Sequence, residues 1–267
     1  MSKPTSTGGE HPGSRRPQSA VQSLSRSLGL LSLLRAAGGE MGLSELAAAA
    51  NLKQPTIHRL IRTLVDEGFV YQLPSRRYAL GPALIPLGET AGRMLGAWAL
   101  PALERLVELS GETAKLALLD GSDAVYVAQV QSKQPMRYFV DPGRRVTLHC
   151  TGIGKALLAA MDDDTAVAIL KRSGMPAFTA NTITSPDRML EEFERIRKLG
   201  YAIDDSERDI SVRCVAAVVA TPKVLAAISV SAPAARLDAR KIQEIGPKIR
   251  SIADELQVSL ADGIPMD

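Results

Sequence analysis

Aromatic residues and cysteines are scarce in this chain of 267 residues. Phe, Trp and Tyr make up 4% of the sequence, so we expect hydrophobic cores built from Leu, Ala, Ile and Val. The two cysteines, Cys150 and Cys214, lie far apart, and the three histidines are not at metal-ligand spacing. Such cysteine usage is typical of a reducing compartment, and we predict two buried free thiols, no metal site and no cofactor.

Long apolar runs are also missing. No stretch approaches the ~18 apolar residues that a membrane-spanning helix requires. Residues 1–20 contain Ser, Pro, Gly, Lys, Arg and His without an apolar run, which favours a disordered tail over a signal peptide. We therefore expect a cytoplasmic protein with no membrane partner.

Positive charge is concentrated near the N-terminus. Residues 1–81 contain ten Lys and Arg against five Asp and Glu, whereas residues 82–267 contain 22 against 24. A chain of this length suggests two domains. A basic head on a slightly acidic body suits a DNA-binding domain, because attraction to phosphates supplies most non-specific affinity for DNA.

Helical periodicity begins at residue 21. Apolar residues recur at intervals of three and four over Val21–Arg35, which predicts a helix with one apolar face. A shorter helix is predicted over Ser44–Ala50, with Ser44 as its N-cap, and a third over Lys53–Glu67. The predicted inner faces are Val21, Leu24, Leu28, Leu31 and Leu34 in the first helix, and Ile57, Leu60, Ile61 and Leu64 in the third.

The outer face of the third predicted helix carries hydrogen-bonding side chains whose lengths suit base edges and phosphates in a major groove. A predicted hairpin follows over Phe69–Leu80 and carries arginines at its tip. Three helices and a basic hairpin predict a winged helix-turn-helix over residues 21–81. The alternative is a small three-helix domain with a solvated polar face. The predicted DNA-binding residues are Gln54, Thr56, His58, Arg59, Arg62, Thr63, Arg76 and Arg77.

Several motifs occur in the order typical of one known family. They include LSELA at residues 43–47, TIHRLIRTL at 56–64, TGIGKALLA at 151–159 and ISVS at 228–231. Over about residues 21–260 the chain resembles the IclR family of bacterial transcriptional regulators. Within that family, residues 69–72 and 109–137 look most like regulators of allantoin use.

The resemblance implies a two-domain α/β protein. Its N-terminal winged helix-turn-helix would be joined by a linker helix, residues 82–97, to a GAF-like α/β effector-binding domain, residues 98–262. The resemblance also implies homodimers, often paired into dimers of dimers, on palindromic operators in double-stranded DNA.

The C-terminal part mixes helices and strands without strict alternation, which favours an α/β sensor fold over a doubly wound sheet. Strands are predicted at residues 115–120, 124–131, 136–140, 201–205, 212–220 and 225–231, and helices at 97–109, 155–161, 162–172, 185–199 and 238–260.

A glycine-rich turn at residues 151–154 precedes one of these helices. Backbone N–H groups at a helix start can bind an anion, and the alternative is a tight turn whose glycines only permit packing. The resemblance implies a ligand site at this loop, completed by an acidic residue, a cysteine, apolar walls and two serines. Serines two residues apart share one face of a strand, so both can reach one ligand. The predicted effector-binding residues are Tyr138, Val146, Thr151, Gly152, Ile153, Asp204, Val212, Cys214, Ser229 and Ser231.

These patterns predict a regulator, more often a repressor in this family, whose operator affinity changes with a small carboxylate or ureide, such as a glyoxylate- or allantoate-like molecule. One alternative is a C-terminal domain that only dimerises. Another is an enzyme in which His149 activates Cys150 beside the glycine-rich turn. Neighbours in a chain rarely point at each other and no Asn or Asp partner is evident, so we predict no enzyme and no catalytic residue.

Overall fold

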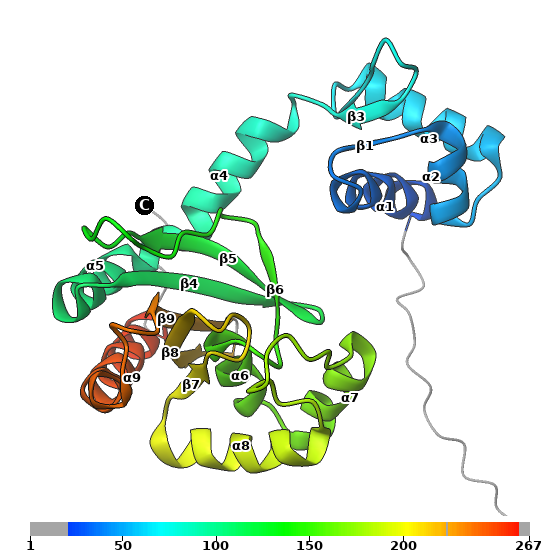
Figure 1. The fold of residues 1–267 in the computed structure, drawn as a ribbon. Helices are drawn as coiled ribbons and strands as arrows, with labels where there is room; N and C mark the ends of the chain where they lie inside the picture. Colours follow the sequence, from blue (N-terminus) through cyan, green and yellow to red (C-terminus); the bar gives the residue numbers. More distant parts are fainter. Residues whose placement is uncertain (1–20, 223, 262–267) are drawn as a thin grey trace, which may run out of the picture. The chain divides into compact units, whose positions relative to one another are not determined.

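The computed structural model describes residues 21–222 and 224–261 (Figure 1). The predicted tail, residues 1–20, lies outside the described residues. The chain forms two compact units that divide at Gly88, within the helix α4 (Leu84–Gly96). This helix falls inside the predicted linker, residues 82–97. No described helix combines the length and apolar character that crossing a membrane requires.

The N-terminal unit contains three helices and a small sheet. The helices are α1 (Gln22–Ala36), α2 (Leu43–Ala50) and α3 (Gln54–Asp66). The strands β1 (Glu40–Met41), β2 (Val70–Gln72) and β3 (Tyr78–Leu80) pair antiparallel in the order β1-β3-β2. The predicted helices and hairpin are therefore confirmed. The predicted inner face of the third helix is also confirmed, with Ile57, Leu60, Ile61 and Leu64 buried.

The predicted inner face of the first helix is partly wrong. Val21, Leu24 and Leu28 are 64%, 58% and 54% exposed, whereas Leu30 and Leu34 are fully buried. Leucines occur on more than one side of this helix, and α2, α3 and β3 pack against α1 mainly through its second half. Periodicity alone could not select the covered side.

The predicted cap of the second helix is wrong as well. Gly42, not Ser44, is the N-cap of α2, and its backbone N–H donates to Glu45 Oε2 at 2.8 Å. Ser44 lies inside the helix, where its Oγ accepts a hydrogen bond from Gln54 Nε2 at 3.0 Å.

The C-terminal unit is built around a six-stranded antiparallel sheet (Figure 1). Helices α5 (Leu100–Ser110) and α9 (Ala239–Ala261) pack on one face. Helices α6 (Gly152–Ala159), α7 (Asp163–Ser173) and α8 (Pro186–Leu199) pack on the other. In sheet order the strands are β6 (Arg145–Thr147), β5 (Asp123–Val130), β4 (Thr113–Asp120), β9 (Leu225–Pro233), β8 (Val212–Ala220) and β7 (Ala202–Asp205).

Most predicted elements of this unit are confirmed, but the strand expected at residues 136–140 is wrong. That segment has no regular structure, and the edge of the sheet is formed by β6 instead. Tyr138 does not extend the sheet but lies against Lys115, whose Nζ is 3.9 Å from the centre of the tyrosine ring. By contrast, the predicted cap of α8 is confirmed, since Ser185 Oγ accepts from the Arg188 N–H at 3.3 Å.

Candidate functional site

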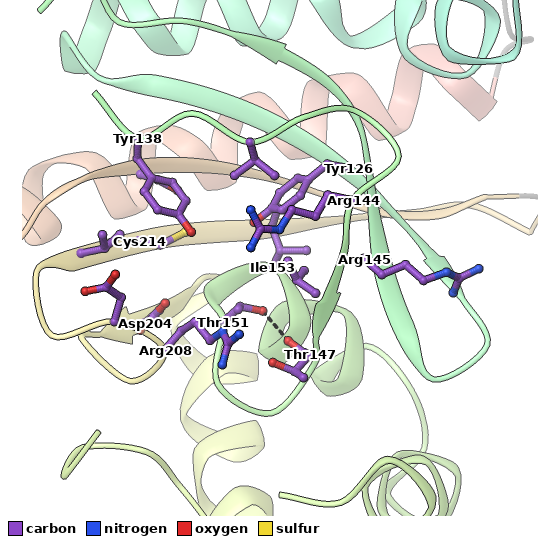
Figure 2. Close-up of a pocket in the computed structure, with 15 residues that line it drawn as sticks. Tyr126, Tyr138, Arg144, Arg145, Thr147, Thr151, Ile153, Asp204, Arg208 and Cys214 are labelled. Carbon is purple, nitrogen blue, oxygen red and sulfur yellow. Dashed lines mark hydrogen bonds between the residues drawn. The ribbon is translucent and has the colours of Figure 1, made fainter. Parts of the chain in front are cut away.

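A cavity of about 110 Å³ opens where the first turn of α6 meets the sheet and the segment before β6 (Figure 2). Eight of the ten residues predicted to bind an effector line it: Tyr138, Val146, Thr151, Ile153, Asp204, Val212, Cys214 and Ser231. The sequence did not single out the other lining residues: Tyr126, Val140, Arg144, Arg145, Thr147, Arg208 and Asp209. The volume is many times that of one water site, so a small metabolite fits.

The start of α6 is fixed by Thr151. Its Oγ1 accepts a hydrogen bond from the Gly154 N–H at 3.1 Å and donates to the Thr147 carbonyl at 2.9 Å. Gly154 lies against the backbone of Leu148, where an added Cβ would be 2.2 Å from the carbonyl oxygen. The glycine at this position is therefore needed for packing. The helix N-terminus also faces the cavity, so both interpretations of the glycine-rich turn have a physical basis.

The other two predicted residues lie near the cavity without lining it. A Cβ on Gly152 would be 3.0 Å from Cys214 Sγ, so this glycine lets α6 approach β8 closely. Ser229 is fully buried, and its Oγ has no hydrogen-bond partner among the residues that the structure describes. It pairs in register with Lys115 on β4.

The sheet floor brings an acid and a thiol together. Cys214 pairs in register with Asp204 on one side and with Ser231 on the other, so the three side chains lie on one face. Burial raises the pKa of Asp204 to about 7, although the hydrogen bond that its Oδ1 accepts from the Glu207 N–H lowers this pKa. Near neutral pH this carboxyl group is partly protonated and can donate a hydrogen bond to an anion.

Arginines at the mouth add positive charge. Arg145 pairs with Asp120 and Asp123, whereas the Arg208 guanidinium stacks 3.7 Å from the centre of the Phe178 ring. Arg144 lies beside Tyr126 in the cavity wall (Figure 2). A basic pair after a Pro-Gly turn, shortly before Thr151, could have indicated Arg144 and Arg145 in the sequence, but it gives no indication of Arg208.

The segment that carries Arg208 is anchored by a buried ion cluster. Lys155 on α6 is 1% exposed and pairs with Glu207 and, at 3.0 Å, with Glu192 on α8. Because the Glu207 N–H binds Asp204, the cluster and the cavity floor share one short segment. Loss of the cluster would therefore disturb the cavity as well as the fold.

The contacts of Cys150 give no support to the cysteine-enzyme alternative. Its Sγ lies 3.0 Å from Thr147 Oγ1, while His149 Nε2 lies 3.0 Å from the Pro176 carbonyl. Burial raises the pKa of Cys150 to about 11, so the group is a thiol at neutral pH. The neighbouring histidine is thus engaged elsewhere and the nucleophilic form is disfavoured.

The second candidate surface is the outer face of α3. Gln54, His58, Arg59, Arg62 and Thr63 are exposed there, and Thr56 is partly exposed. Arg76 is exposed at the hairpin tip, where its φ of 62° makes the tight turn.

Arg77, unlike the neighbouring Arg76, is held by ion pairs within the domain. Its guanidinium pairs with Glu40 and with Glu45, each at 3.0 Å, and so ties the hairpin to β1 and α2. These contacts give Arg77 a positioning role within the domain, besides any role on DNA.

Comparison with known proteins matches both units. The model of the IclR helix-turn-helix domain matches residues 23–74, and that of the bacterial transcriptional regulator IclR C-terminal domain matches residues 91–258. The transcriptional repressor IclR of Escherichia coli is 37% identical over 250 residues, covering 91% of this chain and 90% of the relative. The transcriptional repressor AllR of the same species is 31% identical over 256 residues, covering 93% and 94%.

A solved structure shares the fold and contains a ligand. It is an IclR homologue from Microbacterium hydrocarbonoxydans in complex with 4-hydroxybenzoate, 20% identical, with a TM-score of 0.72 over 91% of this chain and 100% of that one. Both Escherichia coli relatives are transcriptional repressors. The chain therefore belongs to the IclR family of bacterial transcriptional regulators.

Proposed function

We propose that the chain represses transcription as a homodimer, or a dimer of dimers, whose α3 helices enter successive major grooves of a palindromic operator. The observation that carries this proposal is the division of α3 into a buried apolar face and an exposed face bearing Arg59 and Arg62. Arginines supply phosphate and groove contacts, while Gln54, Thr56 and His58 are the candidates for reading bases.

Exposed apolar side chains support self-association. Val21, the N-cap of α1, and Leu24 and Leu28 within the helix recur at intervals of three and four, so they form one apolar stripe that no described residue covers. A contiguous exposed apolar patch is typical of a site of interaction with another protein surface. Two copies related by twofold symmetry would match a palindromic site.

The cavity is proposed to bind a small organic acid in the cytoplasm, with a ureide as the second candidate. The N-terminus of α6, Arg144 and Arg208 attract a carboxylate, and a protonated Asp204 can donate to it. The carboxylate ligand of the structural neighbour agrees with this chemistry. An acid changes operator affinity only as far as it binds the two arrangements of the dimer with different affinity.

Arg62→Ala tests the DNA interface. Removing one phosphate-contacting cation is expected to weaken operator binding by roughly tenfold and to reduce the slope of log K against log salt by about one. Fluorescence anisotropy with an operator duplex over a series of salt concentrations measures both. Arg35→Ala, which removes another exposed charge at the end of α1, is the matched control. If the two variants bind alike, α3 is not the helix on DNA.

The acid site is tested by thermal shift. At least one of three acids, glyoxylate, 4-hydroxybenzoate or allantoate, is expected to raise the melting temperature of the protein by a few degrees. This rise is expected to be larger at pH 6 than at pH 8. The pH dependence follows from Asp204, whose pKa of about 7 leaves it protonated at pH 6 and charged, hence repulsive to an anion, at pH 8.

Asp204→Asn, which mimics the protonated acid, is expected to keep at pH 8 the shift that the parent shows at pH 6. Asp66→Asn, an exposed position in the N-terminal unit, is the control. A shift in the parent that is equal at both pH values would contradict the role given to Asp204.

A further inference from the structure

Lys115 is a buried cation that forms no ion pair with any described residue. It lies within β4, near the centre of the sheet, and its side chain is fully buried. Its Nζ has no hydrogen-bond partner among the residues described, and neither has the Oγ of Ser229, which pairs with it in register on β9. A buried ammonium is costly unless it is paired, so this position has no stability reason to be a lysine.

Aromatic rings separate this cation from the cavity. The Nζ lies 3.9 Å from the centre of the Tyr138 ring and 5.5 Å from that of Tyr126, and both rings line the cavity. The groups that could share its charge are these two phenols and the thiol of Cys214. Burial lowers the pKa of Lys115 to about 8, so the amine is still mostly charged at neutral pH. The rings only partly replace a true counter-ion.

Tyr138 can uncover the cation without unfolding the sheet. The ring belongs to a segment without regular structure, half-buried, whose neighbours Met136 and Phe139 are exposed. A change of its side-chain rotamer would remove the nearer of the two rings from Lys115 and leave every strand pair in place.

We propose that Lys115 and Ser229 form a second anion subsite behind Tyr138, so that the effector is a small acid with a negatively charged group at each end. The inference rests on the proposed function and specifies its ligand class. One carboxylate lies at the start of α6 near Arg208, and the other pairs with Lys115. A carboxylate paired with a buried ammonium and a hydroxyl forms charge-assisted hydrogen bonds, which exceed neutral ones in strength.

Calorimetry with matched acids tests the subsite. Malonate, succinate and glutarate are each compared at pH 7 with the monoacid of the same carbon number, propionate, butyrate or valerate. In the parent protein at least one diacid is expected to bind tenfold or more tightly than its partner monoacid. Lys115→Met is expected to remove that preference and to leave the affinity for the monoacid unchanged, whereas Lys133→Met, at an exposed position, retains the preference.

Proton uptake provides a second readout, which a purely structural lysine would not give. Pairing with a carboxylate raises the pKa of Lys115 from about 8, so binding of the preferred diacid at pH 8.5 takes up a proton. The heats measured in Tris and in phosphate then differ more for the parent than for Lys115→Met, because in the variant Asp204 alone can take up a proton.

The outcomes distinguish failure of the Lys115 subsite from failure of the acid cavity. Monoacids that bind as tightly as every diacid, or a diacid preference that survives in Lys115→Met, overturn the subsite and leave the proposed acid cavity standing. Absence of binding by every acid, together with no thermal shift by glyoxylate, 4-hydroxybenzoate or allantoate, overturns the acid cavity and the subsite together.

Discussion

Lys155→Met is expected to lower the free energy of unfolding by about 3–5 kcal/mol, the range found when one partner of a buried ion pair is removed. The side chains of Lys155, Glu192 and Glu207 are 1%, 10% and 6% exposed, so little solvent is present to screen them. Without the ammonium, Glu192 keeps its ion pair with Arg195 at 2.7 Å, whereas Glu207 is left without a cation, close to Glu192 in the protein interior. Glu207 must then take up a proton or move towards water, and either change costs stability.

Urea unfolding at pH 7 measures this loss, and two further variants identify its cause. Lys155→Met combined with Glu207→Gln is expected to regain part of the stability, because only one of the two carboxylates then remains charged. Lys198→Met removes the pair with Glu194, whose side chains are 81% and 70% exposed, and is expected to cost less than about 0.5 kcal/mol. A loss for Lys155→Met as small as that of Lys198→Met would show that the buried cluster contributes no net stability.

The loss in Lys155→Met should also depend on pH. Burial already raises the pKa of Glu207, and removing the cation raises it further. The folded variant therefore binds a proton more readily than the unfolded chain, and its deficit relative to the parent shrinks as the pH falls from 7 to 5.

Gly154→Ala is expected to destabilise the C-terminal unit by about 3 kcal/mol, at the upper end for overpacked sites. The added Cβ would lie 2.2 Å from the carbonyl oxygen, 2.3 Å from Cα and 2.6 Å from the carbonyl carbon of Leu148. These are backbone atoms, so no rotamer change relieves the clash. The start of α6 must shift, and the Thr151 cap and the cavity wall shift with it.

Thermal melting with and without a binding acid measures both effects. The control is Gly29→Ala in α1, where nothing lies within 4 Å of the added Cβ. Because alanine favours helix over glycine, Gly29→Ala is expected to stabilise the protein by up to about 1 kcal/mol. Equal melting temperatures for the two variants would mean that Leu148 yields easily and that the approach of α6 is not tight.

Local patterns in the sequence determined the N-terminal unit and most of the secondary structure. The inner face of α3 follows from the spacing of its apolar residues, which matches the 3.6-residue period of an α-helix. The hairpin follows from the alternation of apolar and polar residues on either side of a turn. The cap of α8 at Ser185 and the turn at Gly154 are likewise local signals. The motif order that indicated the family also placed eight predicted residues around one cavity.

Contacts between distant segments decided the rest. Which side of α1 is covered depends on α2, α3 and β3, and the segment around Tyr138 covers a lysine that lies more than twenty residues earlier in the chain. Strand register brings Lys115 beside Ser229, and the fold of α6 onto α8 buries Lys155 between two glutamates. A lone lysine in a sequence is normally read as solvated. Only the tertiary structure shows its burial, because the energy of a buried charge depends on neighbours that sequence spacing does not specify.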